Sequence, residues 1–178
     1  MFRNTVSLLV LAVVGMTFMV GSLAEAKGGV LVVLVVTGAF FAAGLVGHYF
    51  ALKNNPVRVG SANYLPIMVT AVIAMVVTWG LSVELGLNVC VASGLVGIFA
   101  ALILPGKLAA VAYAASFAGM SSSAVITGLP MVICAGLLVG GLFILATPVY
   151  EGYGGKLGTI AAGAVLVTVL IFGTLGVG

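Results

Sequence analysis

Charged residues are scarce in this sequence of 178 residues, which has six basic side chains, three acidic ones and no aspartate. A water-soluble domain carries roughly 25% charged residues, whereas this chain carries 5%, together with 63% apolar residues. The mean hydropathy is +1.43. So few charges cannot cover a soluble globule of this size. The composition therefore predicts an integral membrane protein and excludes a soluble enzyme, a nucleic-acid binder and a disordered chain.

Acidic residues are missing from the interior of every long apolar run. The three glutamates, Glu25, Glu84 and Glu151, lie in or beside the predicted loops. Carriers that couple to protons or sodium commonly keep a carboxylate deep in the membrane. We therefore predict that transport by this chain is not driven by protonation of a buried acid. His48 is the one side chain near the membrane whose type titrates close to neutral pH.

Sets of catalytic or ligating residues are lacking as well. One histidine, two cysteines and three glutamates provide no cluster of the three or four ligands that a metal site needs. The absence of aspartate removes the Ser–His–Asp triad, and no Walker A or GxGxxG sequence occurs. The basic residues are single and scattered, at Arg3, Lys27, Lys53, Arg58, Lys107 and Lys156. We predict no enzyme activity, no metal, no cofactor and no nucleic-acid partner.

Apolar runs, by contrast, fill most of the chain. An α-helix needs about 20 apolar residues to cross a bilayer, and the sequence contains runs of about that length. The predicted spans are 5–23, 29–51, 64–83, 86–104, 107–127, 129–148 and 156–177. They predict an all-α, multi-pass integral membrane protein. Residues 1–178 would form one transmembrane domain, a bundle of six or seven helices.

The number of spans depends on residues 107–127, which are rich in alanine and serine and only weakly hydrophobic. This segment is long enough to be a seventh helix, buried among the others. It could instead be a re-entrant hairpin that turns at 120–123, because irregular backbone is tolerated at membrane depth where protein or water covers it. Small residues elsewhere, such as Gly136 and Gly140, predict close helix packing.

Basic residues in the loops orient the chain. Lys and Arg concentrate on the cytoplasmic side of a membrane, and five of the six lie on the side of the N-terminus in the seven-span arrangement. In the six-span arrangement, four basic residues lie on the side of the N-terminus and two on the other side. Both place the N-terminus and the 53–63 loop in the cytoplasm, at the plasma (inner) membrane.

Arg3 and Ala24-Glu25-Ala26 also resemble a secretory signal with its cleavage site. We count residues 1–26 as retained, with cleavage as the alternative.

The densest group of hydroxyl side chains falls in the ambiguous segment. In hydrocarbon each hydroxyl needs a partner, so the group indicates either a small-residue helix with satisfied hydroxyls or a polar pathway for a solute. The candidate pathway residues are Tyr113, Ser116, Ser121, Ser122, Ser123 and Thr127.

Three further polar residues lie near the ends of predicted spans: His48, Glu84 and Asn88. They are candidates for the mouth of the pathway, and the alternative for each is an ordinary interfacial residue. Trp79 also lies near a predicted span end, where an aromatic belt contacts the lipid headgroups.

These patterns predict a small membrane transporter or channel for a small solute or ion, surrounded by the lipid bilayer and working as a homo-oligomer. The alternative is a structural or accessory subunit of a larger complex, in which another membrane protein supplies the energy or the catalysis.

Overall fold

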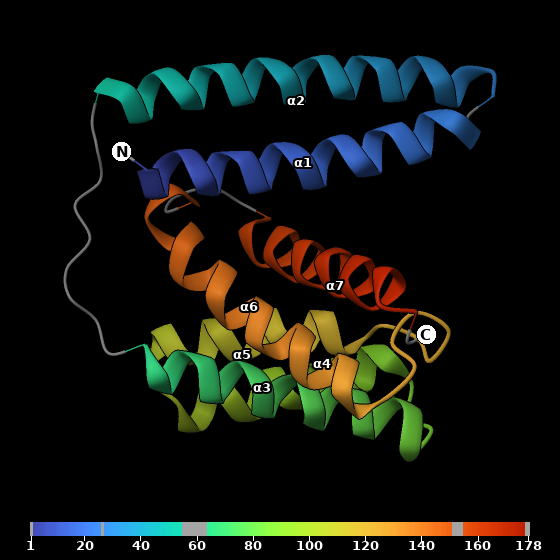
Figure 1. Cartoon of the computed structure of the whole chain (residues 1–178), viewed down its shortest axis with the longest axis vertical. Coiled ribbons are helices and arrows are strands. Elements are labelled where there is room, and N and C mark those ends of the chain that lie inside the picture. Colours follow the sequence, from blue (N-terminus) through green and yellow to red (C-terminus); the bar gives the residue numbers. More distant parts are fainter. Residues whose placement is uncertain (1, 26, 55–63, 151–154, 177–178) are drawn as a thin grey trace. The chain divides into compact units, whose positions relative to one another are not determined.

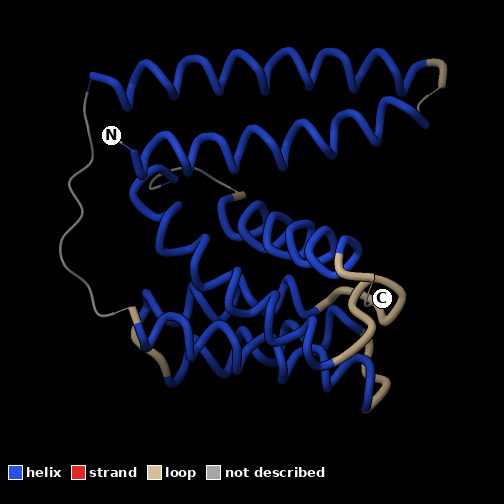
Figure 2. The backbone as a smooth tube through the Cα atoms, viewed as in Figure 1, coloured by secondary structure: helices blue, strands red, loops and turns tan. Residues whose placement is uncertain are grey.

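All the elements in the described part of the chain are helices. A computed structural model describes residues 2–25, 27–54, 64–150 and 155–176 (Figure 1 and Figure 2). The elements are α1 (Phe2–Glu25), α2 (Gly29–Asn54), α3 (Leu65–Trp79), the π-helical turn η1 (Gly80–Glu84), α4 (Val89–Ile103), α5 (Gly106–Gly119), α6 (Leu129–Tyr150) and α7 (Lys156–Thr174). The predicted all-helical class is confirmed for these residues.

Three of the helical segments are long and apolar enough to cross a membrane. They are Leu65–Glu84, which comprises α3 and η1, Leu129–Ala146 within α6, and Lys156–Thr174, which is α7. With 20, 18 and 19 residues, at a rise of 1.5 Å per residue, they extend about 27–30 Å, close to the thickness of a hydrocarbon core. By length and composition, these segments agree with the predicted membrane protein.

The chain divides into two compact units. Unit 1 comprises residues 1–60 and 145–151, and unit 2 comprises 61–144 and 152–178. In unit 1, α1 and α2 form a hairpin in which the two helices contact each other. Val32, Val33 and Val35 point in different directions around α2 and are all exposed. A helix that is apolar on every side suits lipid surroundings. One transmembrane domain over residues 1–178 stays a prediction.

In unit 2, α5 is the central helix. It packs against α3, α4 and α7, and most of its residues from Val111 to Gly119 are buried. The contacts between α4 and α5 run in opposite directions along the two helices, because Ser93 meets Ser116 and Gly97 meets Tyr113. The two helices are therefore antiparallel and turn at Leu104–Pro105.

Small residues set the distance between α3 and α6. A Cβ atom added to Gly136 would lie 2.8 Å from the Cα atom of Val72, and one added to Gly140 would lie 2.8 Å from the sulfur of Met68. The backbones approach closely only because these two positions carry no side chain. The predicted close packing at Gly136 and Gly140 is confirmed, and the order of the contacts makes α6 antiparallel to α3.

The end of α5 differs from the predicted span 107–127, because the helix stops at Gly119. The next residues form tight turns, in which the N–H of Met120 bonds to the carbonyl of Phe117 and the N–H of Ser121 to that of Ala118. The Ser121 hydroxyl also donates to the Ala118 carbonyl, at 2.8 Å. Serine hydroxyls compete in this way with the helical hydrogen bonds, and residues 120–128 form an irregular connection to α6.

Candidate functional site

A pair of buried hydroxyls joins α4 to α5. Ser93 and Ser116 are 3% and 0% exposed, and their oxygens lie 2.9 Å apart. The Ser116 hydroxyl donates its single proton to the Tyr113 carbonyl, at 2.8 Å. Ser93 must therefore be the donor within the pair, because a serine hydroxyl carries one hydrogen. Ser116 is thus satisfied inside the protein and contributes to packing between the two helices.

This pair should give a measurable coupling energy. In a double-mutant cycle on Ser93→Ala and Ser116→Ala, we expect the free energies of unfolding in detergent to be non-additive by about 0.6 kcal/mol, the average for hydrogen bonds between membrane helices. As a control, Ser93→Ala combined with Thr168→Val should be additive, because the Thr168 hydroxyl bonds to Ala164 of its own helix. Additivity for Ser93 and Ser116 would contradict the assigned bond.

Tyr113 lies one turn before Ser116, on the same side of α5, which meets α4. Its side chain is 41% exposed, and its ring packs against that of Phe117 with the centroids 4.5 Å apart. A Cβ atom at Gly97 would lie 2.8 Å from the ring, so glycine at that position in α4 makes room for it. Both hydroxyl residues of α5 thus face α4, but Ser116 is buried and Tyr113 is exposed.

The remaining predicted pathway residues lie on the irregular connection between α5 and α6. Ser122 and Ser123 are exposed, and so is Thr127. The Ser122 carbonyl accepts the N–H groups of Val125 and Ile126, at 2.9 and 3.0 Å, and Ile126 is fully buried. The connection is therefore a turn anchored by one apolar side chain, with Ser122, Ser123 and Thr127 exposed and Ser121 half-buried.

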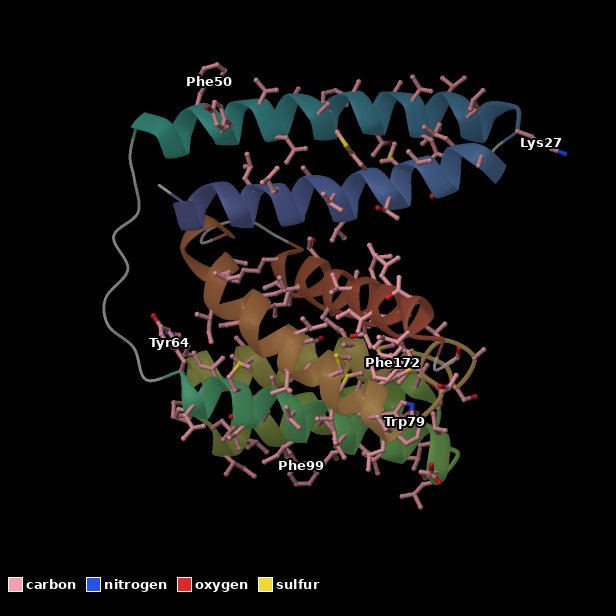
Figure 3. All side chains as sticks on the ribbon, viewed as in Figure 1. Lys27, Phe50, Tyr64, Trp79, Phe99 and Phe172 are labelled. Carbon is pink, nitrogen blue, oxygen red and sulfur yellow. The ribbon has the colours of Figure 1, made fainter. Side chains whose placement is uncertain are left out.

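This connection lies level with the end of α3. A Cβ atom at Gly119 would lie 2.7 Å from the Cβ atom of Thr78 and 3.1 Å from the carbonyl oxygen of Met75. The C-terminal ends of α3 and α5 therefore lie together, and the two helices run parallel. The last residue of α5, Gly119, contacts Thr78, the residue that precedes Trp79. Figure 3 shows Trp79 at the same end of unit 2 as the α5–α6 connection.

Trp79 has a buried donor without a visible acceptor. Its side chain is 7% exposed, and within the described residues its Nε1 atom has no hydrogen-bond partner. The sequence places this residue in an aromatic belt, but the structure places it inside the protein. Directly after it the helix widens into the π-helical turn η1, where the Leu85 N–H bonds to the Gly80 carbonyl. Such turns occur frequently at functional sites.

Two of the three predicted mouth residues are at this same end. Glu84 ends η1 and is exposed, and Gly86, with a φ of +68°, allows the turn into α4. The Asn88 side chain accepts the Cys90 N–H at 2.9 Å, so Asn88 caps the N-terminus of α4. His48 belongs to α2 of unit 1, and its side chain lies outside the described residues.

An apolar cavity of about 480 Å³ opens between α3 and α4, with Ala112 of α5 also in its wall. Its lining includes Ile73 and Val77 of α3 and Phe99 of α4. Figure 3 shows Phe99 on the outer face of unit 2. This cavity is not predictable from the sequence, because its walls are ordinary apolar residues. Among the described residues, no three His, Cys, Asp or Glu side chains gather as a metal site would require.

No protein-family model matches this chain, and no curated protein or solved structure shows significant similarity to it.

Proposed function

We propose that this protein is a small membrane transporter or channel for a small solute, and that it works as a homo-oligomer. The supporting observation is the level at which the central helix ends. Gly119 lies against Thr78, whereas α3 and η1 continue to Glu84, about 9 Å further at 1.5 Å per residue. If Leu65–Glu84 crosses the hydrocarbon core, the hydroxyl-rich connection begins inside it. Irregular backbone at that depth needs cover from protein or water.

An interrupted helix of this kind is a feature of transporter sites. Where a helix stops inside the membrane, its free backbone groups and nearby hydroxyls can bind a solute. Helix α5 has 14 residues, about 21 Å at the helical rise, which is shorter than a hydrocarbon core of about 30 Å. Residues 120–128 would complete the crossing as the polar lining of a narrow path.

We also propose seven crossings rather than six and a re-entrant loop. Helix α5 runs parallel to α3, and α6 runs antiparallel to α3. The connection between α5 and α6 therefore lies at the end opposite to Lys107, where α5 begins. A re-entrant hairpin would return the chain to the end from which it entered. With seven crossings and the orientation favoured by the positive-inside rule, the N-terminus lies on the cytoplasmic side of the plasma (inner) membrane. The α5–α6 connection then faces the outside.

Flux through purified protein in lipid vesicles tests this proposal. With radiolabelled acetamide as the probe, we expect uptake above that of protein-free vesicles, no accumulation against its gradient, and no effect of an imposed pH gradient. The reason is that Glu84, the one acidic residue whose side chain is described, is exposed at a helix end. Potassium and nitrate serve as charged probes. Permeability no higher than that of protein-free vesicles to all three probes would contradict transport. Accumulation driven by the pH gradient that persists in His48→Gln would contradict the uncoupled mechanism.

A subunit of a larger membrane complex remains the second candidate. It is favoured by the apolar cavity between α3 and α4, which another membrane helix could fill. Purification distinguishes the two proposals: a stable oligomer of this chain alone supports the transporter, and obligatory co-purification of a second chain in fixed proportion supports the subunit.

A further inference from the structure

The chain has a single tryptophan, and its indole N–H is a buried hydrogen-bond donor that has no acceptor among the described residues. Trp79 is 7% exposed, and within the described residues its Nε1 atom finds no acceptor. Buried donors in native proteins are nearly always paired, with the protein, with water or with a ligand. The unpaired indole therefore indicates that something outside the described chain reaches it.

Several acceptors on residues next to Trp79 in the sequence, and one at the end of α5, already take part in hydrogen bonds. The Thr78 hydroxyl bonds to the Ala74 carbonyl, the carbonyls of Val76 and Val77 accept the Gly80 N–H, and the Trp79 carbonyl accepts the Ser82 hydroxyl. At the neighbouring end of α5, the Ala118 carbonyl accepts both the N–H and the hydroxyl of Ser121. These acceptors thus serve the helix ends, and none of them bonds to the indole N–H.

We propose that the Trp79 indole N–H binds a small uncharged solute through a hydrogen-bond acceptor, at the end of unit 2 formed by α3, η1 and the α5–α6 connection. This inference rests on the proposed transport function, for which it names the solute class and a binding residue. An indole nitrogen is a donor only, so it selects an acceptor such as a carbonyl oxygen and disfavours a cation.

The charges around this end favour an uncharged solute over an anion. Lys107 is at the start of α5, whereas Gly119 is at the end that lies against Thr78. In Figure 1, α7 likewise begins at the end of unit 2 away from the α5–α6 connection, so Lys156 is distant too. The charged side chain at the indole end is Glu84, at the end of η1. A buried anion needs a compensating charge, and a carboxylate provides the wrong sign.

The single tryptophan makes a direct test possible. In the full chain labelled with ¹⁵N and reconstituted in lipid nanodiscs, one indole N–H resonance belongs to Trp79. We expect this N–H to exchange with deuterium at least about tenfold faster than the amide of Ala115 in the buried α5, because solute and water reach the indole. Acetamide should shift the resonance saturably, and potassium nitrate at the same concentration should not.

Three results would overturn the inference: exchange as slow as that of Ala115, no shift with acetamide, or a saturable shift with nitrate. In vesicles, Trp79→Phe keeps an aromatic ring and removes the donor, so acetamide flux should fall at least about threefold, while Tyr64→Phe at the exposed start of α3 should have no effect. If acetamide shifts the indole resonance but the protein shows no acetamide flux, the binding site is supported and the transport function is contradicted. If the protein shows flux but acetamide does not shift the resonance, the binding site alone is contradicted.

Discussion

Leucine at both Ser122 and Ser123 is expected to lower solute flux by about tenfold or more, equivalent to about 1.4 kcal/mol on the barrier. Both side chains are exposed on the α5–α6 connection, so larger groups there do not overpack the protein. The hydrogen bonds that hold the turn use the backbone carbonyl of Ser122 and survive the substitution. Leucine replaces two hydroxyls with bulky apolar groups at the proposed opening. Flux in vesicles and the thermal unfolding midpoint are the two measurements.

The matched control is Ser22→Leu. Ser22 is also an exposed serine, but it belongs to α1 of unit 1 and not to the α5–α6 connection. We expect normal flux in this variant. Normal flux in the double variant at 122 and 123, with protein incorporated in equal amount, would mean that the solute does not pass the connection. The hydroxyl-rich segment would then have a packing role.

Alanine at Gly119 is expected to have the largest effect on the fold. The new Cβ atom would lie 2.7 Å from the Cβ atom of Thr78 and 3.1 Å from the backbone oxygen of Met75. Neither neighbour is the flexible tip of a long side chain, so α3 and α5 must separate. Overpacking of this kind typically costs about 1–3 kcal/mol. We expect the free energy of unfolding in detergent to fall by that amount.

Gly94→Ala in α4 is the control, because a Cβ atom there meets nothing within 4 Å. Alanine favours a helix over glycine by roughly 0.5–1 kcal/mol, so this variant should be as stable as the original or slightly more stable. Equal stabilities for the two alanine variants would contradict the close contact between Gly119 and Thr78, and with it the level at which α5 ends.

The sequence predicted the helices well, because each is a continuous apolar run between glycine, proline or charged breaks. The predicted span 64–83 and the helical segment Leu65–Glu84 agree closely. Residues 107–127 were harder, because alanine favours a helix throughout, while Ser121 forms a local bond that ends it at Gly119. Such competition between a side chain and the helix is visible only in the geometry.

The candidate site was predictable in part. The role of Asn88 follows from its position before an apolar helix, where asparagine is a preferred cap. The Ser93–Ser116 bond joins residues 23 positions apart, and nothing in the sequence pairs them. The burial of Trp79 was hidden as well, because a tryptophan near the end of an apolar run fits the lipid interface equally well.

The most direct test of the account is the chemical modification of a cysteine at Ser122, in a chain whose Cys90 and Cys134 are replaced by alanine. A membrane-impermeant thiol reagent added outside intact cells should label Ser122→Cys, and should label Asn55→Cys only after the cells are opened. In vesicles, modification of Ser122→Cys should abolish acetamide flux, and modification of Asn55→Cys should leave it unchanged. Full flux through protein shown by mass to be modified at position 122 would contradict a solute pathway at the α5–α6 connection.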